Sequence, residues 1–159
     1  MTNIEQLGWD ERTLGELDHR IVKAPYVRLS SCTIGQYGDA VYVLDLRMYQ
    51  PNAEYLSTVE LHTLEHLLLA GFRKYMPGNF INVAPMGCQT GFYLVLLNEG
   101  RAEKILDVYE SILNDIVNET EVPYANIKDC GHFEHHDLER SKEVARRLLE
   151  SKSGWRQVL

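Results

Sequence analysis

The sequence has no long apolar stretch and no excess of positive charge. It contains no run of about eighteen uncharged apolar residues, the length that a membrane-spanning helix needs, and residues 1–30 lack the apolar core of a signal peptide. Lys and Arg total 16 against 23 Asp and Glu, which gives a formal net charge of -7. Because nucleic-acid surfaces need clustered Lys and Arg, we expect a cytoplasmic protein with no nucleic-acid or membrane partner, whose ligand is a small metabolite or another protein.

Cysteine is scarce. The chain has 3 cysteines, Cys32, Cys88 and Cys130, an odd number in a sequence without an export signal. A disulfide framework is therefore a poor explanation, and thiols with chemical or metal-binding roles are the better one. Cys32 is expected to pack within a β-hairpin.

The sequence also lacks internal repeats and linker-like stretches rich in Gly, Ser and Pro. At 159 residues with 45% apolar content, it can form one domain with a hydrophobic core, so we predict a single domain over residues 1–159. Residue patterns predict strands at 24–35, 40–50, 80–85 and 90–98, and helices at about 57–75, 102–119 and 137–151. This order predicts an α+β fold, an antiparallel four-stranded sheet covered on one face by helices.

The first of these helices carries polar residues within an otherwise apolar sequence. The segment HTLEH places His62 and His66 four residues apart, on the same face of a helix, with Glu65 beside them. HxxEH is the inverted form of a zinc motif in which the histidines bind the ion and the glutamate acts as acid or base. A solvated helix face or a pair of core histidines is the alternative interpretation.

A metal held by His62 and His66 needs a third ligand, and the segment DCGHFEHHDLE supplies candidates. These are Cys130, His132, His135 and His136. We favour Cys130, because a thiolate balances part of the metal charge that two neutral imidazoles leave. The alternative is an inert buried Cys130 next to surface histidines, with His136 capping or supporting the last helix.

A second group of polar residues lies on and between the predicted strands. In PMGCQTGFY, glycines on both sides of Cys88 give the backbone freedom to expose the thiol. Cys88 is thus a candidate acid or base, although a lone cysteine between strands is more often part of the core. Arg47 is a candidate for binding a substrate, and pairing with Asp45 is an equally good interpretation.

Taken together, these segments resemble the S-ribosylhomocysteine lyases, the LuxS family. The resemblance runs through LDHRIVKAPYVR, DLRMYQPN, LHTLEHLLL, PMGCQTGFY and DCGHFEHHDLE, in the family's order and over most of the chain. It implies a LuxS/inverzincin-like metalloenzyme fold, a homodimer with active sites at the subunit interface, and one divalent metal per subunit. Fe(II) is the expected metal, with Zn(II) or Co(II) as replacements.

The resemblance also implies the reaction and the residues that perform it. The family cleaves S-ribosylhomocysteine to homocysteine and 4,5-dihydroxy-2,3-pentanedione, the precursor of the autoinducer-2 signal, by carbonyl migration and β-elimination. The implied roles are metal ligands for His62, His66 and Cys130, acid/base residues for Glu65 and Cys88, and substrate binding for Arg47 and His19.

The sequence departs from the family pattern near the substrate. Where the family commonly has Asp-x-Ser-Pro-Met-Gly-Cys, this chain has Asn82 and Ala84, and Leu14 stands where a serine is usual. Asn82 is then the candidate contact for the homocysteine end of the substrate. Two other functions remain as hypotheses: an HxxEH metallohydrolase that resembles a peptidase, and a metal-binding regulatory protein whose four metal positions are all filled by protein.

Overall fold

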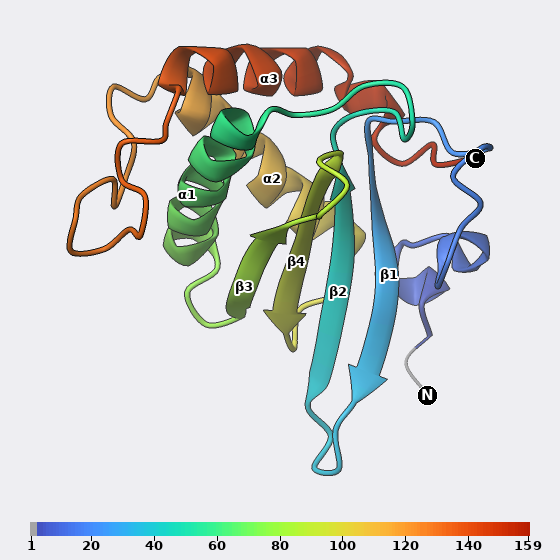
Figure 1. Cartoon of the computed structure of the whole chain (residues 1–159). Coiled ribbons are helices and arrows are strands. Elements are labelled where there is room, and N and C mark those ends of the chain that lie inside the picture. The colour runs from blue at the N-terminus through green and yellow to red at the C-terminus, as the bar shows by residue number, and fades with distance from the viewer. Residues whose placement is uncertain (1–2) are drawn as a thin grey trace.

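The computed structural model describes residues 3–159, which form a four-stranded sheet and three long helices (Figure 1). The strands and helices, in chain order, are β1 Tyr26–Ile34, β2 Ala40–Arg47, α1 Thr58–Tyr75, β3 Phe80–Pro85, β4 Gly91–Leu97, α2 Ala102–Val117 and α3 Leu138–Glu150. Short 3-10 helices occupy Glu5–Leu7, Glu11–Thr13 and Lys152–Gly154. The predicted α+β fold is confirmed, and the observed elements lie within one or two residues of most predicted bounds.

The sheet is antiparallel throughout, with strand order β1-β2-β4-β3. β1 is adjacent to β2 and β3 is adjacent to β4, and these two pairs join where β2 meets β4. There Leu44 lies opposite Leu94, and Leu46 lies opposite Phe92. These four side chains are fully buried, and because strand residues alternate between faces, they mark the face that the helices cover.

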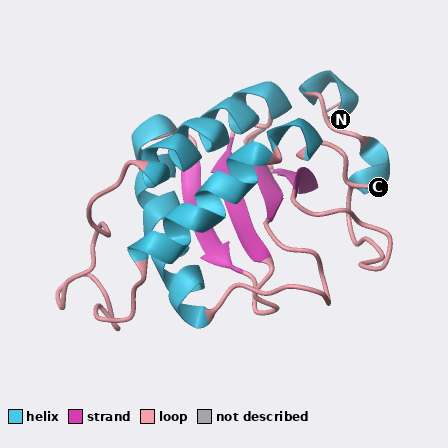
Figure 2. Cartoon of the chain, turned by 90° about the horizontal axis from the view of Figure 1, so that it is seen from above, coloured by secondary structure: helices cyan, strands magenta, loops and turns pink. Residues whose placement is uncertain are grey.

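The helices pack over this face and over one another (Figure 2). α1 packs on β3, while α2 contacts both other helices, and apolar residues from all three helices belong to the main hydrophobic core. α1 begins where the side chain of Ser57 accepts the backbone N–H of Glu60, and the Glu60 carboxylate in turn accepts the backbone N–H of Ser57. This capping box fixes the first turn of the helix that carries the HTLEH segment.

The two ends of the described chain pack onto the body of the protein. The Trp9 indole N–H donates to the Gly100 carbonyl over 2.6 Å, and the Trp155 indole N–H donates to the Leu148 carbonyl over 3.0 Å. Both tryptophans are buried. The N-terminal segment therefore contributes apolar side chains to the core.

Between α2 and α3, residues 118–137 form a long segment without helix or strand, which projects beside α1 (Figure 1). This segment contains Pro123, Cys130 and the histidines of the HFEHH sequence. Among residues 3–159, no helix is both long enough and apolar enough to cross a membrane.

Candidate metal centre

His62 and His66 lie on the side of α1 that faces the 118–137 segment, and each ring is oriented by a backbone carbonyl. His62 Nδ1 is 2.9 Å from the His135 carbonyl oxygen, and His66 Nδ1 is 2.7 Å from that of Pro123. Because a carbonyl only accepts hydrogen bonds, Nδ1 carries the proton in both rings. Each Nε2 is left with a free lone pair, the state in which a histidine binds metal.

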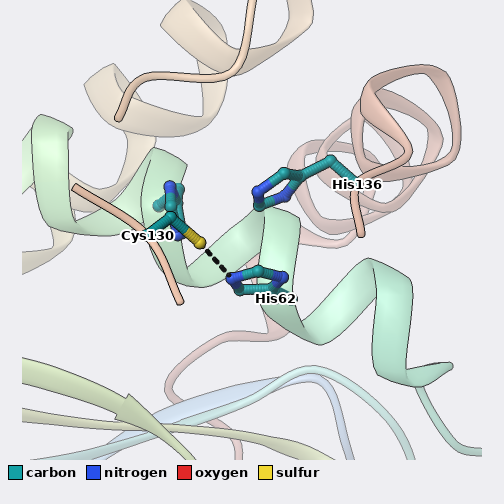
Figure 3. A group of neighbouring side chains, drawn as sticks. His62, Cys130 and His136 are labelled. Carbon is teal, nitrogen blue, oxygen red and sulfur yellow. Dashed lines mark hydrogen bonds between the residues drawn. The ribbon is translucent and has the colours of Figure 1, made fainter. Parts of the chain in front are cut away.

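Cys130 brings a thiol to these nitrogens. Its Sγ lies 3.3 Å from His62 Nε2 (Figure 3), and since that nitrogen has no proton, the thiol is the donor. The backbone N–H of His132 donates to the same sulfur over 3.4 Å. The fold thus places Cys130, the candidate that we favour as third ligand, beside the histidine pair.

His136 joins the same group, although it was predicted only as one of several candidate ligands or as support for the last helix. Its ring centroid lies 4.1 Å from that of His62 and 4.6 Å from that of His66. Donor atoms of His62, His66, Cys130 and His136 all lie within 4.8 Å of one another. Burial, and to a smaller extent the neighbouring histidines, lowers the pKa of His136 to about 4, so the ring is neutral at pH 7.

This donor set fits a divalent transition metal. Imidazole nitrogens together with one thiolate are ligands that zinc and iron accept. Histidines in metal sites also typically donate the N–H of their other ring nitrogen to a carbonyl or carboxylate. The imidazoles of His132 and His135 do not belong to the group. They stack on each other with centroids 4.6 Å apart, and His135 contributes its backbone carbonyl to His62.

A hollow of about 480 Å³ opens beside His62, His66, Cys130 and His136, the four residues that we call the metal group. Glu65 lines it together with His62, His66 and Cys130, which places a carboxylate next to the candidate ligands. Arg73 and Tyr124 also line the hollow, with the Arg73 guanidinium 5.5 Å from the centre of the Tyr124 ring. Sequence reasoning missed both, although Glu65 and Arg73 are eight residues apart on α1 and so lie on the same side of it.

Cys88 and Arg47 form a separate cluster on the other face of the sheet. The Arg47 side chain is 3% exposed and donates to Asp45 through Nη2 over 2.8 Å and Nε over 3.1 Å. Arg47 Nη1 donates to Thr90 Oγ1 over 2.9 Å and lies 3.9 Å from Cys88 Sγ. Arg47 thus both pairs with Asp45 and reaches the exposed Cys88.

Two further side chains, Arg28 and Tyr26, are buried and extend the cluster around Asp45. Arg28 donates to Asp45 over 3.1 Å, and its Nη1 reaches the carbonyl of Gly15, which ties the N-terminal segment to the sheet. Tyr26 donates to Asp45, and burial, with the Asp45 charge, raises the pKa of Tyr26 to about 12. A Cβ at Gly91 would collide with the Leu46 carbonyl, so the strand beside Arg47 requires glycine there.

The remaining candidate residues lie outside both clusters. His19 is exposed, and its Nδ1 donates to the Leu17 carbonyl over 3.0 Å. Asn82 is an exposed residue of β3, and strand alternation places it on the same face of the sheet as Arg47. Leu14 packs against the hydrophobic core.

The histidine pair, the thiol and the glutamate lie together beside one hollow, and comparison with known proteins identifies the family. A model described as S-Ribosylhomocysteinase (LuxS) matches residues 15–158. The chain belongs to the LuxS family. Among curated LuxS relatives, proteins named S-ribosylhomocysteine lyase from Halobacillus halophilus and Dichelobacter nodosus are 46% and 44% identical to it. Each alignment covers 89% of this chain and 93% or 92% of the relative, respectively.

Proposed function

We propose that this protein is a metal-dependent S-ribosylhomocysteine lyase, which releases homocysteine and 4,5-dihydroxy-2,3-pentanedione. The observation that carries the proposal is the meeting of His62, His66 and Cys130 beside Glu65, in a chain of this family. The apolar core, which includes residues from Ile4 to Trp155, supports treating the chain as one metalloenzyme domain. We place this enzyme in the cytoplasm.

His62, His66 and Cys130 are the proposed ligands of the metal, with Fe(II) as the physiological ion and Zn(II) or Co(II) as substitutes. When bound, the metal supplies Lewis acidity to the oxygen atoms of the sugar. The His135 and Pro123 carbonyls support this assignment, because they hold the His62 and His66 rings with Nε2 directed toward the thiol.

Glu65 and Cys88 are the proposed acid/base residues. Moving the ribose carbonyl from C1 to C2 and then to C3 requires a proton to leave one carbon and another to be added at its neighbour, twice. Removal of a proton from C4 then expels the homocysteine thiolate from C5. The C4–C5 enol that remains takes up a proton at C5 and gives up its hydroxyl proton to become the dione, and the thiolate is protonated, so the reaction needs no further reactant. Groups on two sides of the substrate serve these transfers, and Arg47 offers positive charge near the Cys88 sulfur.

The proposed substrate contacts are Arg47, His19 and Asn82. For them to meet a substrate bound at the metal group, they have to come from a second copy of the chain. None of the residues that line the hollow beside Glu65 belongs to the β3–β4 turn that carries Cys88, or to β2, which carries Arg47. A symmetric homodimer brings the cluster of one subunit to the metal group of the other. Part of this face of the sheet carries accessible apolar side chains, which supports this arrangement: Tyr93 is exposed there, and Val43 and Val95 are only partly buried.

The test is to incubate metal-loaded protein with S-ribosylhomocysteine and to measure free thiol. We expect thiol release at a rate that falls when the metal is removed and returns when Fe(II) or Co(II) is added back. As a control, His66→Ala should lose both stoichiometric metal and thiol release. A fully metal-loaded wild-type protein that releases no thiol would contradict the proposed function.

A further inference from the structure

The hydroxyl of Thr90 lies between the guanidinium of Arg47 and the thiol of Cys88. Thr90 is 1% exposed, whereas Cys88 is exposed. Thr90 Oγ1 is 2.9 Å from Arg47 Nη1 and 3.0 Å from Cys88 Sγ, while Arg47 Nη1 and Cys88 Sγ are 3.9 Å apart. The hydroxyl is therefore the closer of the two polar groups to the sulfur.

Arg47 fixes the direction of both hydrogen bonds of the Thr90 hydroxyl. A guanidinium group only donates, so Thr90 Oγ1 accepts the proton of Arg47 Nη1. The hydroxyl's own proton then needs an acceptor. Among residues 3–159, Cys88 Sγ is the single acceptor within hydrogen-bond distance of that hydroxyl. The Thr90 hydroxyl therefore donates to the sulfur.

The backbone around Thr90 holds the hydroxyl in this place. The Thr90 carbonyl accepts the backbone N–H of Met48 over 2.9 Å. Gln89, between Cys88 and Thr90, has a φ of 62°, in the left-handed region that favours glycine. The Gln89 carbonyl and the Gln89 side-chain amide each bond the backbone of Leu56 over 2.8 Å. Such a conformation persists only where the surroundings enforce it, so Thr90 is held firmly beside Cys88.

The charged groups behind Thr90 favour negative charge at the sulfur. Arg28 and Arg47 both pair with the carboxylate of Asp45, and all three side chains are buried. Tyr26 donates to the same carboxylate and, with its pKa raised to about 12 by burial and by the Asp45 charge, is neutral at pH 7. Two guanidinium groups that share one carboxylate leave an excess of positive charge, which stabilises a thiolate at Cys88.

We propose that the Thr90 hydroxyl stabilises the thiolate form of Cys88 and is a positioning residue for proton transfer. Its role in turnover rests on the proposed function. The thiolate takes a proton from one carbon of the sugar and returns it to the neighbouring carbon, so the sulfur alternates between thiolate and thiol. The Thr90 proton stays on its own oxygen throughout and supplies a charge-assisted hydrogen bond whenever the sulfur is ionised.

The reaction of Cys88 with iodoacetamide tests this hydrogen bond in the metal-loaded protein, without substrate. The thiolate is the reactive form, and mass spectrometry of the Cys88 peptide follows this thiol alone. Thr90→Val should raise the pH of half-maximal alkylation by about one to two units, the scale of a lost hydrogen bond to a charged group. The maximal rate at high pH should not fall, because Cys88 is exposed.

Three further variants complete the experiment. Thr90→Ser keeps the hydroxyl and should restore the wild-type profile. Thr90→Ala, smaller than valine, also lacks the hydroxyl and should show the same shift even if valine prevents folding. The matched control is Thr13→Val, which removes another buried hydroxyl, one that donates to the Asp10 carbonyl over 2.8 Å, and should keep the wild-type profile.

An unchanged midpoint in the variants without the hydroxyl would overturn the proposal. A rate that falls by the same factor at every pH would also overturn it, because that result would indicate altered access to the sulfur. A shifted midpoint in Thr90→Ser would assign the effect to the methyl group and not to the hydroxyl.

Turnover tests the role of Thr90 in the proposed reaction separately. Thr90→Val should retain its metal and lower kcat for S-ribosylhomocysteine at least about tenfold, and Thr90→Ser should restore kcat. A shifted alkylation profile with wild-type kcat would remove Thr90 from the proton transfers. Because alkylation uses no substrate, a protein without lyase activity would still show the shifted profile, which distinguishes failure of the proposed function from failure of this inference.

Discussion

Glu65 and Cys88 are the residues proposed to move protons without holding the metal. Glu65→Gln and Cys88→Ala should therefore retain stoichiometric metal and lose turnover by at least about a hundredfold, the scale of general acid/base catalysis. Metal analysis and the thiol assay measure both quantities in the same sample. Cys32→Ala, which alters a partly buried thiol of β1, is the control and should keep its activity. Full turnover in Cys88→Ala would instead favour a metallohydrolase, because hydrolysis has no role for that thiol.

Asn82 is the residue at which this chain gives up a charge that its family commonly has. An aspartate there would offer the homocysteine ammonium a charge-assisted hydrogen bond, worth about 1.5–3 kcal/mol. Asn82→Asp should consequently lower KM for S-ribosylhomocysteine by roughly ten- to a hundredfold. Steady-state kinetics would show a smaller effect for a thioether that lacks the ammonium. An unchanged or higher KM would mean that position 82 does not contact that end of the substrate.

The β4–α2 junction depends on a single carboxylate. Glu99 is 8% exposed, and its side chain accepts the backbone N–H of Arg101 over 3.0 Å as well as the Arg101 guanidinium. Glu99→Gln should lower the free energy of unfolding by about 1 kcal/mol at pH 7, the usual net contribution of one intramolecular hydrogen bond. Urea unfolding of both proteins measures this difference.

The same carboxylate predicts how that difference changes with pH. The hydrogen bond from Arg101 lowers the pKa of Glu99 in the folded protein, so its stabilising effect is complete above the unfolded pKa of about 4.3 and is lost as the pH falls through the folded value. The gap between wild type and Glu99→Gln should accordingly narrow below about pH 4. A gap that widens in acid would contradict this assignment of charge.

At the level of elements, alternation and periodicity predicted the strands and helices because each pattern is local. The contact between β2 and β4 was not predictable in this way, since pairing between non-consecutive strands depends on packing. The same distinction applies to the metal group. His62 and His66 share a helix face by their spacing alone, whereas three histidines within five residues gave no sign of which ring turns inward. His136 does so because Thr63 holds its Nδ1.

At the scale of the whole molecule, the separation of Cys88 from the hollow beside Glu65 makes a prediction about two subunits. We expect a dimer in sedimentation. Heterodimers of Cys88→Ala and Glu65→Gln chains, purified through two different tags, should contain one intact site and one doubly altered site, and so show about half of wild-type activity. Each variant homodimer should be almost inactive. Heterodimers as inactive as the homodimers would mean that both residues act within one chain.

Trp9 and Trp155 are the only tryptophans of the sequence, and both fasten an end of the chain to the body rather than lining the hollow beside the metal group. Intrinsic fluorescence of this protein will therefore report whether the chain ends are docked, and will be a poor indicator of metal occupancy. Removing the ion should leave the emission maximum in place as long as both indoles stay buried. A red shift on gentle heating, before the far-ultraviolet circular dichroism changes, would mark the release of an end from an otherwise folded sheet.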